Sequence, residues 1–410
     1  MILLVALIAC DDSITRPFSS KNGDSQPTTG AGSGTLMLPN HCEPPADLPV
    51  DPLVLDREYF FPADPPGTLL VELVDIAVEG DLVYAVGQGG LMLFDTATAE
   101  LRGTVGTGGP GRFHRVEVIG DGYVAVSHRD IGVRVVDVSN PDMPFEVWSR
   151  EDRGLEGLAV VGDRLYVSAR GAGVQVLDIG DPGSPTDAGT GGELEAPWEL
   201  VAVGEDWLYA ADNVLGVVPI DLADPDSPLV GDPVSLDGAV LHVATDGTYL
   251  FVSNGGNGVV IMDLSNPAAP VEISRAVTGG SVLMSAVDGT TLWTADHESV
   301  MAFDISDIRA PLPIGREEVR QYALAVDAED GIGWVGDWGY VEGWIATPGG
   351  GELDAPDDTV WLPEAGGSAE LRLTNRGAGD LLLSGATVDD SRVSVRASSD
   401  VILPGESATS

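Results

Sequence analysis

The stretch "VRVVDVSNPDMPF", residues 133–145, recurs along the chain with small changes. It returns as "VQVLDIGDPGSPT" at 174–186, "VVPIDLADPDSPL" at 217–229, "VVIMDLSNPAAPV" at 259–271 and "VMAFDISDIRAPL" at 300–312. The aspartates at this position of the repeat are 41 to 43 residues apart, and they are Asp95, Asp137, Asp178, Asp221, Asp263 and Asp304. A fixed period of this length indicates a repeat architecture.

Each repeat contains the signals of four short strands. A turn such as Gly120-Asp121 precedes an aromatic and β-branched run such as "YVAVS", and a polar or Gly-rich loop follows. Then come the apolar strand that ends in aspartate, a proline-containing turn and a weaker strand such as "FEVWS". Helical periodicity is absent. Four strands in about 42 residues predict an all-β chain folded as a β-propeller.

The number of blades depends on a degenerate last repeat. In "EDGIGWVGDWGYVEGWIATP", residues 329–348, Trp344 stands 40 residues after Asp304, where the next aspartate is expected. Counting this repeat gives seven blades, with six as the alternative. The segment "PLVLDREYF", residues 52–60, has no other place in the pattern. We expect it to close the ring by pairing with the last blade, because an unpaired sheet edge invites aggregation.

The repeated aspartates are interpreted as structural. Each ends the third strand of its repeat, where Ser, Asn and Asp side chains favour turns by bonding nearby backbone amides. One aspartate per blade around a wide ring cannot converge on a single substrate. The repeat therefore indicates the scaffold and gives no information about a ligand.

The motifs "VRVVDVSNP", "VQVLDIGDP" and "VVIMDLSNP" resemble the LVIVD repeat of bacterial and archaeal surface proteins, whereas "LMLFDTATA" and "YVEGWIATP" depart from it. The resemblance covers residues 69 to 348. It implies a propeller and an extracytoplasmic setting, and it implies no defined activity. Fold alone does not supply a function, since propellers host many.

The N-terminus, "MILLVALIACDD", resembles the lipobox of bacterial lipoproteins. The resemblance implies a signal segment at 1–10, a lipid on Cys10, and an extracytoplasmic protein anchored to the membrane. The alternative is a stray apolar terminus, because the run is short and lacks a basic region; the true start is expected upstream. Residues 11–51 are polar and predicted to be a flexible linker. Cys42, within it, is either a free thiol or paired outside this chain.

The propeller is assigned to residues 52–348, and the sequence after it no longer follows the repeat pattern. Residues 349–356 are interpreted as a linker. Within 357–410, "LRLTNRGAGDLLL" resembles the Ig-like modules called ASH or choice-of-anchor D domains. Such sandwiches usually have about 100 residues, so an incomplete Ig-like domain is expected and the chain is interpreted as a fragment.

The net charge of the chain limits which classes of binding partner are expected. Lysine and arginine total 20 against 65 acids, a formal net charge of −45. Nucleic acid is not expected as a partner, because phosphate binding needs a basic footprint. Such a charge keeps an exposed protein soluble and attracts divalent cations. No cofactor is predicted, Ca²⁺ is the one cation left open, the metal ligands are unknown, and a monomer is expected.

Catalytic motifs are absent from the sequence. It has no G-x-S-x-G, H-E-x-x-H, C-x-x-C or Walker pattern, so an enzyme is not favoured. Three hypotheses are kept. The first is a surface-anchored binding or scaffold module that recognises a protein or glycan through one propeller face. The second is a metal-dependent, lactonase-like hydrolase using the central channel, and the third is a passive presenter of a missing C-terminal domain.

The propeller pattern also predicts the binding face. First strands begin on the face that carries the loops between second and third strands, and variable loops on a rigid frame usually hold recognition sites. The residues expected around the channel mouth are Asp75, His114, Arg115, Glu156, Trp198, Glu199, His242, Ser285 and Tyr322. The outer loops add His128, Arg129, Asp130, Arg170, Asp212, Asn213, Asn254, Asp296, His297, Asp337 and Trp338.

Overall fold

The computed structural model describes residues 72–98, 100–108 and 111–346 with their side chains, together with the backbone of several strands outside these ranges. The described residues form strands and turns and contain no helix. In this part of the chain, accordingly, no helix has the length and apolarity that a membrane crossing requires. The chain divides into one compact unit at Leu55–Thr347 and another formed by Met1–Val54 with Pro348–Ser410.

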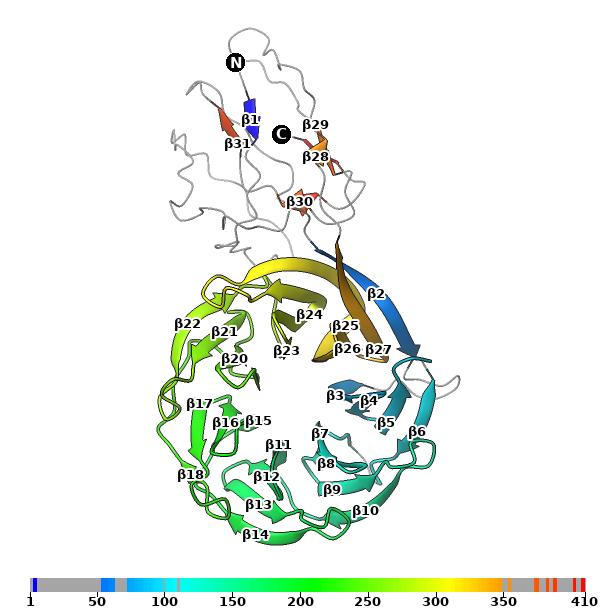
Figure 1. Cartoon of the computed structure of the whole chain (residues 1–410), viewed down its shortest axis with the longest axis vertical. Coiled ribbons are helices and arrows are strands. Elements are labelled where there is room, and N and C mark those ends of the chain that lie inside the picture. Colours follow the sequence, from blue (N-terminus) through cyan, green and yellow to red (C-terminus); the bar gives the residue numbers. More distant parts are fainter. Residues whose placement is uncertain are drawn as a thin grey trace, which may run out of the picture. The chain divides into compact units, whose positions relative to one another are not determined.

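The unit Leu55–Thr347 is a ring of antiparallel sheets (Figure 1). Five of the sheets have four strands in sequence order. The first is β3 (Leu73–Glu79), β4 (Leu82–Gly87), β5 (Gly90–Asp95) and β6 (Leu101–Val105). The second is β7 (Arg115–Gly120), β8 (Tyr123–His128), β9 (Gly132–Asp137) and β10 (Phe145–Arg150). The third is β11 (Leu155–Val161), β12 (Arg164–Ala169), β13 (Gly173–Asp178) and β14 (Thr186–Thr190).

Two further four-stranded sheets and one larger sheet complete the ring. The fourth is β15 (Pro197–Val203), β16 (Trp207–Asp212), β17 (Gly216–Asp221) and β18 (Leu229–Val230). The fifth is β19 (His242–Thr245), β20 (Tyr249–Ser253), β21 (Val259–Asp263) and β22 (Val271–Ala276). The sixth, in spatial order, is β2 (Leu53–Pro62), β27 (Tyr340–Pro348), β26 (Ile332–Asp337), β25 (Leu312–Glu329), β24 (Thr291–Asp304) and β23 (Met284–Asp288).

The propeller therefore has six blades, the alternative count, and the prediction of seven is wrong. The reason is that the last two sequence repeats share one sheet. The start of β24 pairs with β23, and its end pairs with the start of β25. The end of β25 then pairs with β26. The pair His297–Ala323 joins the two ladders, and β25 runs from the sixth repeat into the last one.

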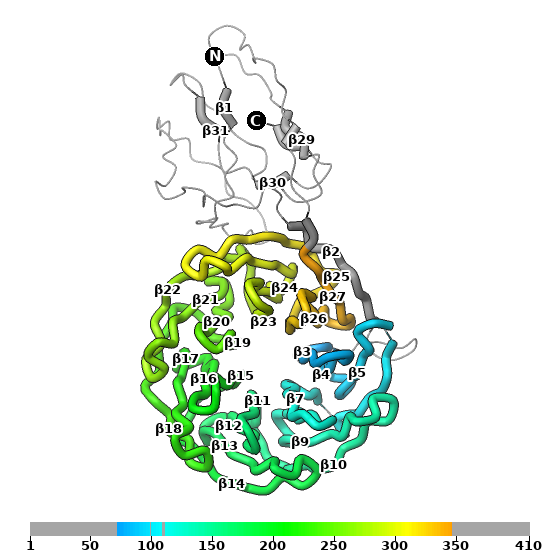
Figure 2. The backbone as a smooth tube through the Cα atoms, viewed as in Figure 1, coloured from blue at the N-terminus to red at the C-terminus, as the bar shows by residue number. Residues whose placement is uncertain are grey.

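Ring closure follows the prediction. β2 is the neighbour of β27 at the edge of the sixth blade, so the expected pairing of residues 52–60 with the last blade is confirmed. The tube in Figure 2 passes once around the ring, and β3 lies beside the last strands. The Leu73 N–H donates to the Trp338 carbonyl at 2.7 Å, and the Val78 N–H donates to Asp327 Oδ2 at 2.8 Å. The first repeat is thereby bonded directly to the last.

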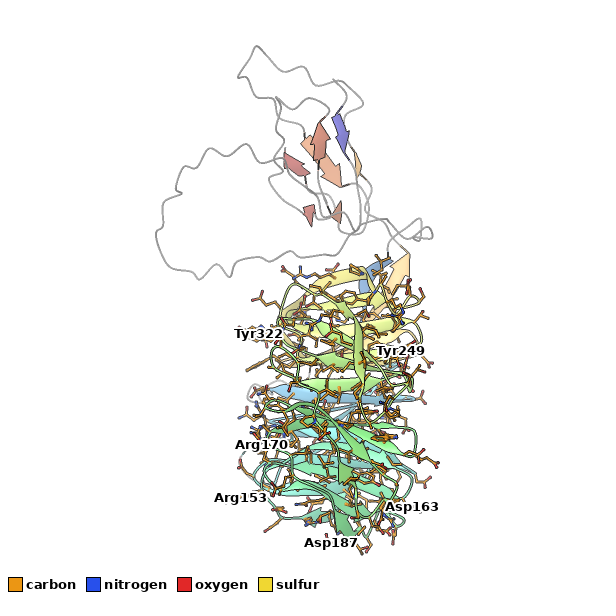
Figure 3. All side chains as sticks on the ribbon, turned by 90° about the vertical axis from the view of Figure 1, so that its left-hand side faces the viewer. Arg153, Asp163, Arg170, Asp187, Tyr249 and Tyr322 are labelled. Carbon is orange, nitrogen blue, oxygen red and sulfur yellow. The ribbon has the colours of Figure 1, made fainter. Side chains whose placement is uncertain are left out.

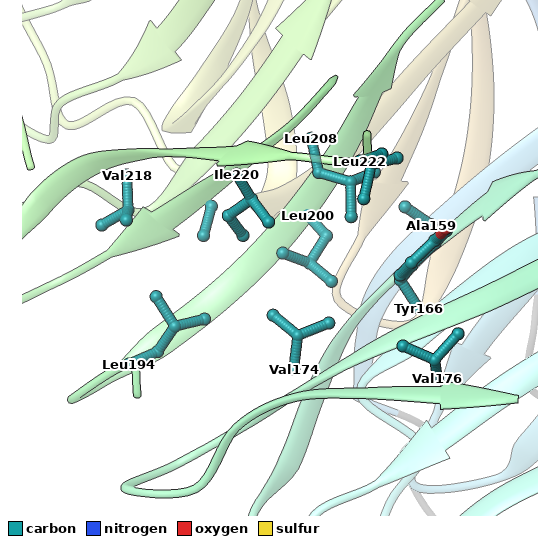
Figure 4. Close-up of a cluster of buried hydrophobic side chains, with 11 residues drawn as sticks. Ala159, Tyr166, Val174, Val176, Leu194, Leu200, Leu208, Val218, Ile220 and Leu222 are labelled. Carbon is teal, nitrogen blue, oxygen red and sulfur yellow. The ribbon is translucent and has the colours of Figure 1, made fainter. Parts of the chain in front are cut away.

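Apolar side chains between neighbouring blades form the core. One cluster joins Tyr166 and Val176 of the third blade to Leu208 and Ile220 of the fourth (Figure 4). Both faces of the second and third strands of a blade are buried, as in β4 and β5, which explains their nearly continuous apolar sequence. Tyrosine hydroxyls add bonds from one blade to the next. The Tyr166 hydroxyl donates to the Pro225 carbonyl at 3.1 Å.

The repeated aspartates sit at the ends of the third strands and bond the turns that follow. In every repeat from the first to the sixth, the carboxylate accepts the N–H two residues further along. The donors are Ala97, Ser139, Gly180, Ala223, Ser265 and Ser306. This is the Asx-type turn. It accounts for the repeated motif by local backbone chemistry.

A second repeated feature is a glycine at the start of the third strand. Gly173 has a φ of 86°, and a Cβ there would overlap the carbonyl oxygen of Gly192. The equivalent glycines, each against a carbonyl at the end of its fourth strand or a few residues after it, are Gly90, Gly132, Gly216 and Gly258. The last two repeats have Ser299 and Tyr340 instead. The two repeats that share a sheet are thus the two without this close approach.

The second unit contributes short strands. β1 (Leu3–Val5) pairs with β31 (Ala386–Val388). The other pairings are β28 (Leu353–Asp354) and β33 (Ser407–Thr409) on β29 (Arg372–Asn375), and β30 (Leu381–Leu382) on β32 (Val401–Ile402). The lipobox at 1–10 with Cys10, the linkers at 11–51 and 349–356, and the Ig-like domain at 357–410 lie outside the residues described with side chains.

Candidate functional site

The predicted mouth residues lie at the beginnings of the first strands. The innermost strands of the ring are β3, β7, β11, β15, β19 and β23 (Figure 2), and they carry Asp75, Arg115, Glu156, Glu199, His242 and Ser285 in that order. Trp198 lies in β15, His114 directly precedes β7, and Tyr322 lies in β25. Figure 3 places Arg170 and Tyr322 on one side of the ring and Asp163 and Tyr249 on the other. We call the side with Arg170 and Tyr322 the mouth face.

A buried ionic cluster joins three blades at the mouth. Arg115, only 7% exposed, forms an ion pair with Glu199 through its Nε. Arg115 also donates to the Trp198 carbonyl at 3.2 Å and to the His114 carbonyl at 2.8 Å. Asp75 Oδ2 accepts the Val116 N–H at 2.8 Å. Because every contact but that to His114 crosses between blades, this cluster fixes the blades around the channel.

A second cluster places two arginines against an indole. Glu156, 2% exposed, accepts from Arg129 at 2.5 Å (Nε to Oε1) and 3.0 Å (Nη2 to Oε2) and from Arg170 Nε at 2.8 Å. The two guanidinium carbons lie 5.7 and 5.9 Å from the Trp198 ring centroid. Arg129 and Arg170 come from the hairpins that follow β8 and β12. We call Arg129, Glu156, Arg170 and Trp198 the arginine–tryptophan cluster.

The remaining mouth residues lie elsewhere on the ring. Ser285 is fully buried and shares a hydrogen bond of 3.0 Å with Ser253. His242 Nδ1 has no hydrogen-bond partner among the described residues. Burial, reinforced by Arg115, lowers the pKa of His242 to about 3, so the ring is neutral. Tyr322 contacts His297 and Trp338. The structure therefore divides the predicted mouth into separate clusters.

Two of the predicted outer-loop aspartates hold loops in place. Asp212 accepts the N–H groups of Glu195, Ala196, Val214 and Leu215. Asp337 accepts those of Arg320, Gln321 and Tyr322. Asn254 donates to the Asp237 carbonyl. Of the other predicted loop residues, His128 and Asp296 are buried, while Asp130 and Asn213 are exposed in their hairpins.

A surface hollow of about 260 Å³ lies beside the arginine–tryptophan cluster and shares Arg129 with it. It is lined by Glu72, Gln88, Gly111, Arg112, His114, His128, Arg129 and Asp130. Burial and the neighbouring charges of Arg129, Arg112 and Arg115 lower the pKa of His114 to about 3. In a chain with a net charge of −45, the lining of this hollow is balanced in charge, because Arg112 and Arg129 stand against Glu72 and Asp130.

Sequence reasoning missed two carboxyl groups further along the first strands. Glu117 Oε1 accepts the Val160 N–H at 3.2 Å, and Asp327 accepts from Val78. Both repeat the bond that Asp75 makes to the next blade. The signal was a pair of charged residues two positions apart, Arg115 and Glu117 in "RVEVIG" and Asp327 and Glu329 in "LAVDAE", since alternate residues of a strand share a face. Among the described residues, no three or more His, Cys, Asp or Glu side chains are arranged to hold a metal ion.

These carboxyl groups predict a pH dependence of stability. Burial raises the pKa of Asp75 and of Glu117 to about 8, and Glu199 adds to both shifts; Arg115 opposes the shift at Asp75. Their unfolded values are about 4, so the folded protein binds protons more tightly. This stabilisation is complete below about pH 4 and is lost as the pH rises toward 8. The melting temperature should therefore fall between pH 5 and pH 8.

A Glu117→Gln variant separates this effect from general charge repulsion. Gln resembles the protonated acid, so the variant should match the wild type at pH 5 and melt at a higher temperature at pH 8. The check is a series of thermal melts of both proteins across this range. Parallel curves for the two proteins at every pH would contradict the assignment.

Comparison with known proteins agrees with this architecture. Residues 110–151, 155–190 and 237–278 match the LVIVD repeat. No curated protein matches the chain. The fold is similar to that of the RRP9 WD40 repeats (11% identity, TM-score 0.58, 72% of this chain and 99% of that one). It is also similar to U3-55K (12%, 0.54, 68% and 96%) and to the computationally designed Ika8 protein (13%, 0.51, 68% and 98%).

At these identities the structural likeness concerns the fold alone. Repeat and fold agree, because the segments that match the LVIVD repeat supply the second, third and fifth blades. The chain is an all-β propeller of six blades that carries three LVIVD repeats.

Proposed function

We propose that the protein is a surface-anchored binding or scaffold module that recognises a protein or glycan partner through its mouth face. The observation that carries this proposal is the arginine–tryptophan cluster. Glu156 is 2% exposed and fixes both guanidinium groups, while the arginine side chains are still 35% and 36% exposed. Rigid, accessible Arg and Trp side chains are the residues that most often dominate binding energy.

The opposite face supports the assignment by contrast. It carries the aspartate turns, whose carboxylates are engaged with their own backbone. Large exposed apolar residues do occur outside the mouth, including Met143, Leu229 and Val271. They come from different blades, and single exposed apolar residues are normal on a soluble protein. The mouth face alone combines hairpins that differ between blades with cationic and aromatic groups fixed by buried partners.

The test compares the wild-type full chain with two matched triple variants as bait for solubilised cell-envelope extract. Arg129→Ala/Arg170→Ala/Glu156→Gln removes the cluster without leaving a buried charge unpaired, which would itself destabilise the protein. Arg102→Ala/Arg164→Ala/Asp178→Asn removes comparable ion pairs on the opposite face. Loss of hot-spot residues weakens binding by about 2 kcal/mol or more, roughly thirtyfold.

We expect the mouth-face variant to lose captured molecules that the wild type and the opposite-face variant both retain. An identical captured set for all three proteins would contradict the proposal. Both variants are melted first, so that loss of binding is compared at equal folded fraction.

Anchoring is the part of the proposal that rests on the N-terminal sequence. In a chain with a complete signal, Cys10→Ala should prevent lipidation and move the protein from the membrane to the soluble fraction, because anchoring depends on the acyl chains. Retention of the variant on carbonate-washed membranes would refute the lipoprotein assignment and leave the mouth-face assignment to its own test.

A further inference from the structure

Three aromatic side chains gather on the mouth face away from the arginine–tryptophan cluster. The ring centroids of His297 and Tyr322 are 4.5 Å apart, and those of Tyr322 and Trp338 are 5.8 Å apart at an interplanar angle of 67°. Tyr322 is 42% exposed, one of the few large apolar side chains so open to solvent. We call His297, Tyr322 and Trp338 the aromatic patch.

Two members of the patch have unusual backbone geometry. Among the described residues other than glycine, only Asp121, His297, Asp330 and Trp338 have positive φ, and the values at His297 and Trp338 are 51° and 47°. Asp and His adopt this conformation more readily than most residues, whereas a bulky side chain there is an outlier. Strain of this kind concentrates at functional sites.

Backbone hydrogen bonds hold Trp338 at its strained, positive φ, but these bonds do not require a tryptophan at this position. Its N–H donates to the Tyr322 carbonyl at 3.0 Å, and its carbonyl accepts the Leu73 N–H at 2.7 Å. A glycine would make both bonds with less strain. What tryptophan adds is the indole beside Tyr322. The residue at this position is therefore explained by its side chain.

A hollow of about 360 Å³ opens at the patch and is lined by Arg320, Gln321, Tyr322 and Trp338. This volume lies within the range of small-ligand sites, roughly 300–1,000 Å³. The backbone of Arg320, Gln321 and Tyr322 is fixed by the buried Asp337 carboxylate. The Arg320 guanidinium lies 5.7 Å from the Tyr340 ring centroid and 3.4 Å from Glu342. The lining residues are thus held in place by the buried residues beneath them.

We propose that this hollow binds a neutral sugar ring of a glycan. The C–H face of a pyranose stacks on an aromatic ring, and amide and guanidinium groups such as those of Gln321 and Arg320 bond adjacent hydroxyls. Pockets of this kind combine aromatic walls with a few placed polar groups. The net charge of −45 disfavours an anionic glycan. This inference rests on the proposed function, since it names the ligand class for the same face.

The test titrates the full chain with a panel of neutral hexasaccharides (of glucose, mannose, galactose and N-acetylglucosamine), following tryptophan fluorescence and heat. At least one should bind. Tyr322→Ala and Trp338→Gly should each weaken that binding at least tenfold. Trp338→Gly should keep or raise the melting temperature, because it relieves the strained φ, so its loss of binding cannot be attributed to unfolding. Tyr249→Ala, on the opposite face, should bind as the wild type does.

The outcomes separate this inference from the proposed function. The triple variant of the arginine–tryptophan cluster should still bind the sugar, since it leaves the aromatic patch intact. If no hexasaccharide binds at millimolar concentration, or if Tyr322→Ala and Trp338→Gly bind unchanged, the sugar site is overturned. Binding of aromatic peptides in place of sugars would also overturn it. In each case the envelope-capture experiment decides the proposed function on its own.

Discussion

Deleting residues 51–61 should cause one of the largest losses of stability of any small change to this chain. The deletion removes nearly all of β2, the strand that pairs with β27 and completes the sixth blade. Losing a few kcal/mol corresponds to a fall in melting temperature of roughly 5–10 °C for a unit of this size. The exposed edge of β27 should also promote aggregation. Thermal melts and light scattering measure both effects.

A deletion of equal length, residues 31–41, is the matched control because it falls in the predicted linker. It should leave the melting temperature of the propeller unchanged. If the two deletions behave alike, β2 does not close the ring and another segment must satisfy the edge of β27.

Gly173→Ala should be the most disruptive single methyl addition in the hairpins of the mouth face. The new Cβ would overlap the Gly192 carbonyl oxygen at a position whose φ is 86°. Positive φ costs an L-residue about 1–2 kcal/mol, and forced displacement of packed atoms adds roughly 1–3 kcal/mol. We expect a loss of about 3 kcal/mol or more in the free energy of unfolding, measured by denaturant titration.

Gly171 lies in the same hairpin and provides the control. Its φ is 64°, but a Cβ there would have no atom within 4 Å. Gly171→Ala should therefore lose only about 1–2 kcal/mol, the backbone contribution alone. Equal losses for the two variants would mean that the close approach to Gly192 does not hold the hairpin. Because this hairpin carries Arg170, the pair also tests how the scaffold positions the arginine–tryptophan cluster.

The repeat itself was sufficient to predict an all-β propeller. The spacing of the aspartates and the alternation of strand and turn signals predicted a four-stranded unit. The strand at residues 52–60 had no place in any repeat, and it was therefore predicted to pair with the last blade. The blade count failed because it assumed that each repeat forms its own sheet. The bridge between His297 and Ala323 is a contact between repeats, and no local pattern encodes it. The missing glycine at Ser299 was a visible sign that the sixth repeat is different.

The sequence predicted where the site residues lie, but it did not predict which residues they pair with. The alternation of strands placed Asp75, Glu156 and Glu199 at the beginnings of inner strands, and the structure has them there. Which arginine each acid would meet depends on packing between blades. Arg115 reaches Glu199 two blades away, and Arg170 reaches Glu156 of its own blade. The partner of a long side chain depends on the packing of the folded blades. The sequence therefore could not predict that the mouth residues form separate clusters.

Site-specific photo-crosslinking in cells that produce the protein tests whether recognition resides on the mouth face. A photoreactive phenylalanine replaces Val214, 63% exposed in the hairpin between β16 and β17, or Met143, 72% exposed in the turn after β9. Both positions tolerate a large side chain because they face solvent. If the partner binds the mouth face, discrete cross-linked species should form from position 214 and none from position 143. Cross-links from position 143 alone, or equally from both, would contradict it.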